Sequence, residues 1–200
     1  MGSKEIKIKF TKEQIEKYNT QGFKLCFSAG VGAEPAFNVV AYADTIAGNV
    51  TISWVDRFKI AATKDKFSNG VKFNISTNPT GIKFGEVYTL PATWVDGTIS
   101  SEKLPENSFK FLNDTASEAS AVIFKTINGK DLPFYISSSP VDSKGNEVMS
   151  PKSIVALWFQ KNAETGTMVS VIKGDLSIFD FSARDGIDLR WDGAHFVEPK

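Results

Sequence analysis

The sequence predicts an all-β protein, a single antiparallel β-sandwich that spans residues 1–200 and carries one short N-terminal helix. Short apolar segments, about a dozen in all, recur at intervals of roughly ten residues, which is the spacing typical of sandwiches and barrels. β-branched and aromatic residues dominate these segments, and 16 of the 200 residues are Phe. We find one helical pattern, whereas a parallel α/β sheet needs a helix between successive strands.

The N-terminal segment predicts a strand followed by the helix. Residues 5–10 alternate apolar side chains with charged ones, which predicts a half-buried strand. Residues 11–19 begin with a capping-box pattern, because Thr11 is followed three residues later by Gln14. The helix is therefore expected to start directly after the first strand.

The rest of the chain is expected to form strands separated by turns. In order, the expected strands are 23–29, 37–42, 50–55, 58–63, 71–77, 82–90, 108–112, 121–127, 132–137, 154–160, 167–172, 176–181 and 187–191. The Asn-Gly pairs at 69–70 and 128–129 predict hairpin turns, and the second pair is the stronger signal. Residues 91–107 and 140–151 contain prolines and no clear period, so we expect loops there.

The charge composition argues against a nucleic-acid partner. Lys+Arg and Asp+Glu both total 23, so the formal net charge is zero. The basic residues are 20 Lys and three Arg, and Arg is the side chain that most often reads phosphates and base edges. A neutral, Arg-poor chain is more typical of a solvated surface than of a nucleic-acid interface.

Cysteine content and hydropathy bear on the compartment. Cys26 is the one cysteine, so an internal disulfide is excluded and a reducing compartment is favoured. The N-terminus lacks the apolar region of a secretory signal, and the longest apolar run, residues 154–159, is far too short for a transmembrane segment. These features predict a cytoplasmic protein, with secretion by a non-classical route left open.

The inventory of reactive side chains predicts no catalytic residue, no metal site and no cofactor. His195 is the one histidine, and no nucleophile motif surrounds it or any serine. The acidic residues near the C-terminus match no calcium loop and are better explained as turn residues. A hydrolase that uses a pair of carboxylates is the enzyme class left open.

The tryptophans are the residues most suggestive of binding. Trp54 and Trp158 stand among apolar residues of expected strands, so we assign them to the core. Trp94 stands in the loop sequence LPATWVDG, and Trp191 stands between Arg190 and an aspartate. A tryptophan in a loop suits stacking on a sugar ring or a position at the lipid headgroup boundary. We therefore predict Trp94 and Trp191 as ligand-binding residues.

Together these observations favour a non-enzymatic binding module. It would recognise carbohydrate or a membrane headgroup through loops at one end of the sandwich. Two alternatives stay open. Alternating Ser/Thr-rich segments are also typical of pore-forming, toxin-like proteins that insert hairpins into membranes. A self-associating structural or storage protein, hence a homo-oligomer, fits the same composition.

Overall fold

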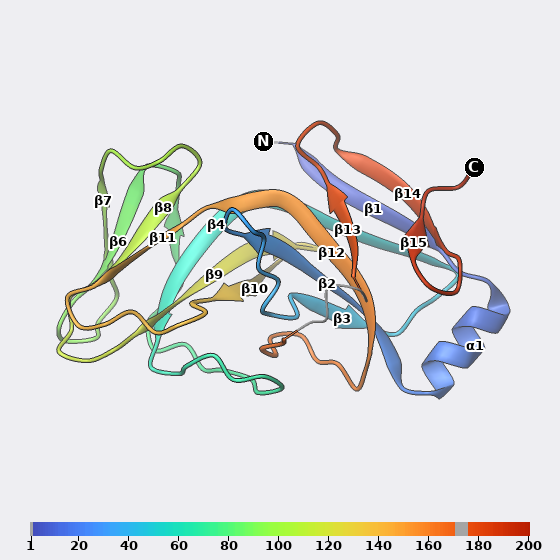
Figure 1. The fold of residues 1–200 in the computed structure, drawn as a ribbon, viewed down its shortest axis with the longest axis horizontal. Coiled ribbons are helices and arrows are strands. Elements are labelled where there is room, and N and C mark those ends of the chain that lie inside the picture. The colour runs from blue at the N-terminus through green and yellow to red at the C-terminus, as the bar shows by residue number, and fades with distance from the viewer. Residues whose placement is uncertain (1, 171–175) are drawn as a thin grey trace.

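The structure is a computed structural model that describes residues 2–170 and 176–200. Most of the regular elements are strands, joined by loops and one helix (Figure 1). The elements are β1 (Ser3–Lys9), α1 (Lys12–Thr20), β2 (Phe23–Val31), β3 (Tyr42–Asp44), β4 (Asn49–Thr63), β5 (Thr80–Ile82), β6 (Glu86–Leu90), β7 (Thr98–Ser101), β8 (Phe109–Asn113), β9 (Ser120–Ile127), β10 (Lys130–Ile136), β11 (Asn146–Met149), β12 (Pro151–Lys161), β13 (Ser177–Asp180), β14 (Gly186–Trp191) and β15 (Phe196–Val197).

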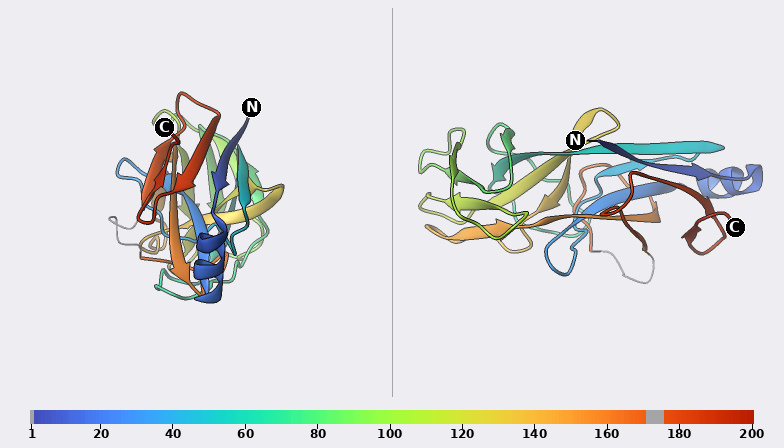
Figure 2. Two further views of the ribbon diagram at one scale, coloured as in Figure 1. Left: turned by 90° about the vertical axis from the view of Figure 1, so that its right-hand side faces the viewer. Right: turned by 90° about the horizontal axis from the view of Figure 1, so that it is seen from above.

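Among the described residues the strands form three sheets. The largest has the order β10-β9-β4-β1-β14-β15, with β5 paired to the C-terminal half of β4. The second sheet has the order β13-β12-β2-β3, and the small third sheet has the order β11-β8-β6-β7. Figure 2 shows an elongated molecule with the small sheet at one end and α1 at the other. The predicted all-β, sandwich-like fold is confirmed, but the sheets are mixed, because β1 pairs with β14 and β6 with β8 in parallel.

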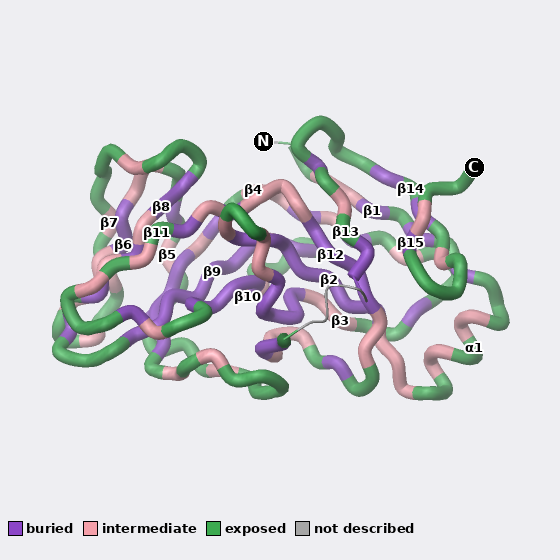
Figure 3. Tube along the Cα trace, viewed as in Figure 1, coloured by how far each residue is buried: buried purple, intermediate pink, exposed green. Residues whose placement is uncertain are grey.

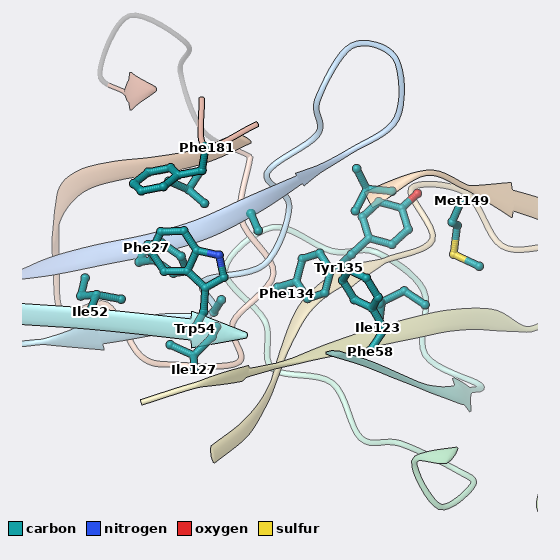
Figure 4. Packing of buried hydrophobic residues seen from close by; sticks show 14 of the residues in the cluster. Phe27, Ile52, Trp54, Phe58, Ile123, Ile127, Phe134, Tyr135, Met149 and Phe181 are labelled. Atoms are coloured by element: carbon teal, nitrogen blue, oxygen red, sulfur yellow. The ribbon is translucent and has the colours of Figure 1, made fainter. Parts of the chain in front are cut away.

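The sandwich core lies where the inner faces of β4 and β2 meet. The ring centroids of Trp54 and Phe27 lie 5.2 Å apart, and that of Phe181 lies 4.8 Å from that of Trp54 (Figure 4). The cluster continues through Phe134 of β10 into the small sheet, where Phe109 of β8 is fully buried. One continuous core therefore holds all three sheets together.

The outer faces of the two larger sheets are also apolar, and irregular segments cover them. In β9, Val122 and Phe124 point away from the sandwich core and form a second cluster with residues of β4 and β10. Phe67 and Phe73, from the irregular segment 64–79, pack onto this cluster. Figure 3 shows the result, since β9 is buried along almost its whole length. We call residues 64–79 the covering segment.

Local turn and cap chemistry matches two of the three local sequence predictions. The Thr11 hydroxyl accepts from the Gln14 backbone N–H at 3.2 Å, and the Gln14 side chain accepts from the Thr11 N–H at 3.0 Å. Asn128 and Gly129 have φ values of 47° and 76°, as a two-residue type I′ turn requires, and they join β9 to β10. The capping box and this hairpin are confirmed. The hairpin predicted at residues 69–70 is wrong, because Gly70 lies in a turn with φ 80° but residues 71–77 after it form no strand.

The predicted strand at 71–77 is wrong. This part of the covering segment makes one isolated bridge, between Lys72 and Thr167, and otherwise follows an irregular path. The alternating sequence does not produce one buried face either, because Phe73 packs on the protein while Val71 and Ile75 are exposed. The segment lies across an apolar sheet face, where packing needs no ladder of hydrogen bonds.

Several predicted boundaries also change. The expected strands at 50–55 and 58–63 are one strand, β4, interrupted by a bulge, while Gly85, with φ 81°, divides the expected strand 82–90 into β5 and β6. The expected loops at 91–107 and 140–151 contain the short strands β7 and β11.

Two further expected strands are mostly absent. Of residues 37–42, only Tyr42 enters a strand, β3. In the expected strand 167–172, Thr167 and Met168 form isolated bridges, and residues 171 and 172 lie outside the described residues.

Candidate functional site

Trp94 lies in the loop that joins β6 to β7, at the end of the molecule formed by the small sheet. Its backbone has φ 57°, in the left-handed region, and its N–H donates to the Pro91 carbonyl at 3.0 Å. The indole is half-buried against the core cluster, and the Lys64 ammonium lies 5.0 Å from its ring centroid. The next residue, Val95, is 61% exposed. An aromatic ring and an aliphatic residue of this loop thus lie beside a cation from the covering segment, and we call Trp94, Val95 and Lys64 together the Trp94 loop tip.

The Trp94 loop is clamped to the covering segment by Asp96. Both oxygens of the Asp96 carboxylate accept from Asn78, at 2.8 Å from the backbone N–H and 2.9 Å from the side-chain amide. These hydrogen bonds hold the pKa of Asp96 below its ordinary value. The clamp keeps the two segments together at any pH at which Asp96 is ionised.

A buried tyrosine fixes the other side of the same loop. The Tyr88 hydroxyl accepts from the Gly97 backbone N–H at 3.1 Å and lies 3.0 Å from the Thr77 hydroxyl. A Cβ on Gly97 would stand 2.2 Å from the Tyr88 ring, so a side chain cannot fit there. The loop around Trp94 is therefore held in one conformation from both sides.

Trp191 lies in a different environment, at the end of β14 beside α1. Its indole N–H donates to the Tyr18 hydroxyl at 2.8 Å, and its ring centroid lies 5.0 Å from that of Phe159 and 4.7 Å from that of Phe196. Its carbonyl accepts from the Gln14 side chain at 2.9 Å. These contacts join the helix to β14 and β15.

The structure does not bring the two predicted binding residues together. Trp94 belongs to the end formed by β6 and β7, whereas Trp191 lies beside α1 at the opposite end (Figure 1). His195 is exposed in the turn between β14 and β15, and its backbone N–H donates to Asp192 at 2.8 Å. The predictions that Trp54 and Trp158 are core residues are confirmed, with 1% and 3% exposure.

An ion-pair cluster inside the core was missed from the sequence. Lys125 of β9 is 1% exposed, and its ammonium lies 3.0 Å from the Asp56 carboxylate and between the rings of Phe58 and Phe134, at 5.3 and 5.2 Å. Lys4 of β1 reaches the same carboxylate at 3.4 Å. The sequence signal was the lysine at an inward position of the apolar run AVIFKTI.

Burial and the neighbouring charges have opposite effects on the pKa values of Lys125 and Asp56. Burial lowers the pKa of Lys125, and the Asp56 charge offsets that effect only in part. Burial alone would raise the pKa of Asp56, but the charges and hydrogen bonds of Lys125 and Lys4 outweigh it and hold the pKa below its ordinary value. The bulge in β4 after Val55 provides the extra residues that let Asp56 turn toward Lys125.

Another half-buried carboxyl connects two sheets. Glu147 of β11 accepts hydrogen bonds from the hydroxyls of Tyr135, at 2.8 Å, and Ser137. Burial raises the pKa of Glu147, because these two hydrogen bonds compensate only part of the lost hydration. The group ties the small sheet to the β10 end of the large sheet.

Other reactive groups are inert or dispersed. Cys26 is buried, and burial raises the pKa of its thiol to about 12, so the reactive thiolate is suppressed. The described residues hold no cluster of three or more His, Cys, Asp or Glu side chains arranged to bind a metal ion. In the part of the chain that the structure describes, no helix has the length and apolar character needed to cross a membrane.

Comparison with known proteins finds no matching family model, no matching curated protein and no matching solved structure.

Proposed function

We propose that this chain is a non-enzymatic binding module that docks on a membrane surface. The loop tip formed by Trp94, Val95 and Lys64 lies at the level of the lipid headgroups, with the indole at the boundary between water and hydrocarbon. Trp191 is an internal packing residue on this proposal, because its N–H is already used by Tyr18.

The backbone conformation of Trp94 is the observation that carries the proposal. A left-handed conformation costs an L-residue roughly 1–2 kcal/mol, and glycine or asparagine would adopt it at less cost. The clamp through Asp96 and Gly97 imposes that conformation on a bulky residue and holds the indole at the surface. Backbone strain of this kind is concentrated at functional positions.

The neighbours of Trp94 favour a lipid surface over a sugar. A sugar site needs several polar groups that converge on the ligand, but both Asp96 oxygens already accept from Asn78. Val95 exposes an aliphatic side chain that offers no hydrogen bond. Tryptophan beside an aliphatic residue and a lysine whose stem can extend toward headgroups is typical of membrane interfaces.

Co-sedimentation of the full chain with phosphatidylcholine vesicles, with and without phosphatidylserine, tests this proposal. We expect Trp94→Gly to weaken binding about tenfold or more, equivalent to ~1.4 kcal/mol, and Val95→Ser to weaken it less. Val148→Ser is the matched control, because Val148 is also exposed but belongs to β11. Its vesicle binding should equal that of the unmodified chain.

Further measurements distinguish membrane docking from carbohydrate binding and from pore formation. Because glycine relieves the backbone strain, Trp94→Gly should change the urea midpoint less than Trp94→Ala does. Equal vesicle binding by the unmodified chain and Trp94→Gly would contradict the proposal, as would binding to a glycan array that Trp94→Gly abolishes. Release of a trapped dye from the vesicles would contradict simple docking and favour a pore-forming protein.

A further inference from the structure

A cavity of about 470 Å³ opens on the outer side of the sheet β13-β12-β2-β3. Its described wall combines segments far apart in the chain: the turn after β2 with Phe37, the covering segment with Phe67, and β12 with Ile154. Val169 and Ile178 of the C-terminal third also belong to the described wall. This volume falls in the range of roughly 300–1,000 Å³ that is typical of small-molecule sites.

The described lining is uncharged and mostly apolar. Phe37 and Val169 form part of the floor and are 7% and 6% exposed, while Ile178 at the rim is 49% exposed. No lysine, arginine, aspartate or glutamate belongs to the described lining. Among these described lining residues a charged ligand would find no charged partner to compensate its lost hydration, which is costly.

Asn38, the buried polar side chain of the described wall, has a structural role. The Asn38 amide donates to the Ile136 carbonyl at 2.6 Å, and its oxygen accepts from the Ile136 N–H at 3.3 Å. These bonds fasten the wall to β10 and occupy both ends of the amide. Asn38 therefore helps to fix the shape of the cavity, and its amide does not require a hydrogen bond from a polar ligand.

The wall is also preformed. The turn after β2 folds back so closely that a Cβ on Gly30 would stand 2.5 Å from the Pro35 side chain and 3.3 Å from the Phe37 ring. Such close approach leaves Phe37 little room to collapse inward and fill the space. Apolar surface that stays accessible to water lacks the stabilisation that burial provides, so an occupant that covers it would be bound favourably.

We propose that this cavity binds an uncharged, predominantly apolar small molecule. The site shares no residue with the Trp94 loop tip, so it is a second binding activity that does not depend on membrane docking. The bound molecule would cover Phe37 and Val169 and lie under the Ile178 side chain.

Fluorescence titration of the full chain with two related probes tests the ligand class. N-phenyl-1-naphthylamine is neutral, and 1-anilinonaphthalene-8-sulfonate is the same ring system with an added negative charge. We expect saturable binding of one neutral probe per chain, with a blue shift, and an affinity at least about tenfold higher than that of the anionic probe. Tighter binding of the anionic probe, or no saturable binding of the neutral one, would overturn the proposal.

A pair of matched substitutions locates the binding. Ile178→Trp fills the rim, whereas Ile75→Trp makes the same change at an exposed position, 40% accessible, outside the described lining. Ile178→Trp should lower the affinity for the neutral probe about tenfold with an unchanged urea midpoint, and Ile75→Trp should leave it unchanged. Equal effects of both substitutions, or no effect of Ile178→Trp, would refute this location.

The outcome is separable from that of the membrane proposal. Trp94→Gly should bind the neutral probe as the unmodified chain does, whether or not it binds vesicles. A stoichiometry of one probe per two chains would show a site formed between copies and would overturn the proposal for a cavity within one chain.

Discussion

Single residues show where the amino-acid pattern and the fold disagree. Lys125 occupies an inward position in an apolar strand and is buried, although its neighbours in the sequence offer it no ionic partner. Its partner, Asp56, is 69 residues away in the chain and faces inward only because β4 bulges there. No local sequence pattern predicts an ion pair between residues so far apart in the chain.

The Asp56–Lys125 pair predicts unequal effects of removing each partner. Asp56→Asn leaves the buried Lys125 ammonium uncompensated, so we expect a loss of about 3–5 kcal/mol in the free energy of unfolding. Lys125→Met removes the buried cation and leaves Asp56 with Lys4, so its effect should be near zero or stabilising. Urea denaturation of the two variants measures the difference, and similar losses in both would contradict this assignment.

At the scale of elements, periodicity did not determine how the covering segment folds. Residues 71–77 alternate in sequence as a strand would, yet Phe73 packs on the protein while Val71 and Ile75 are exposed. The segment forms almost no ladder in the described structure, because it packs on the face of a sheet and not along its edge. The hairpin at Asn128-Gly129 was predictable because its conformation depends on the two turn residues themselves.

The two sides of the covering segment should differ in their contribution to stability. Phe73→Ala removes a ring that packs on the outer cluster of β9 and β10, so we expect a loss of about 2 kcal/mol, below the 3–5 kcal/mol of a fully buried Phe. Val71→Ala, at 48% exposure in the same segment, is the control and should stay within about 0.5 kcal/mol. Thermal unfolding of both variants measures the contrast, and a matching loss in Val71→Ala would show that the segment packs differently.

At the scale of the whole molecule, Glu147 makes the connection between two sheets sensitive to pH. Its pKa is raised in the folded protein, so the folded state binds this proton more tightly than the unfolded state does. The resulting stabilisation is fully present below the ordinary pKa of a glutamate and is lost as the pH rises through the raised value. Groups with lowered pKa values, such as Asp56 and Asp96, act in the opposite direction at lower pH.

Comparing two variants isolates the contribution of Glu147. Glu147→Gln cannot ionise, so its stability relative to the unmodified chain should increase as the pH rises from about 4 to neutral. Urea midpoints measured across that range provide the test. A difference that is constant with pH would show that Glu147 does not titrate with a raised pKa. Glu106→Gln, at an exposed carboxylate in the loop between β7 and β8, serves as the control substitution.

The sequence by itself determined the all-β class, the capped N-terminal helix, the Asn-Gly hairpin and the burial of Trp54 and Trp158. These features depend on side-chain spacing and on local backbone preferences, which any chain segment carries with it. Only the tertiary structure decided that β1 and β14 pair in parallel, that Asp56 meets Lys125, and that Trp94 and Trp191 lie at opposite ends. Those facts depend on which distant segments become neighbours. The neighbours are selected by the burial of both faces of the sheets, and no single segment of the sequence encodes that burial.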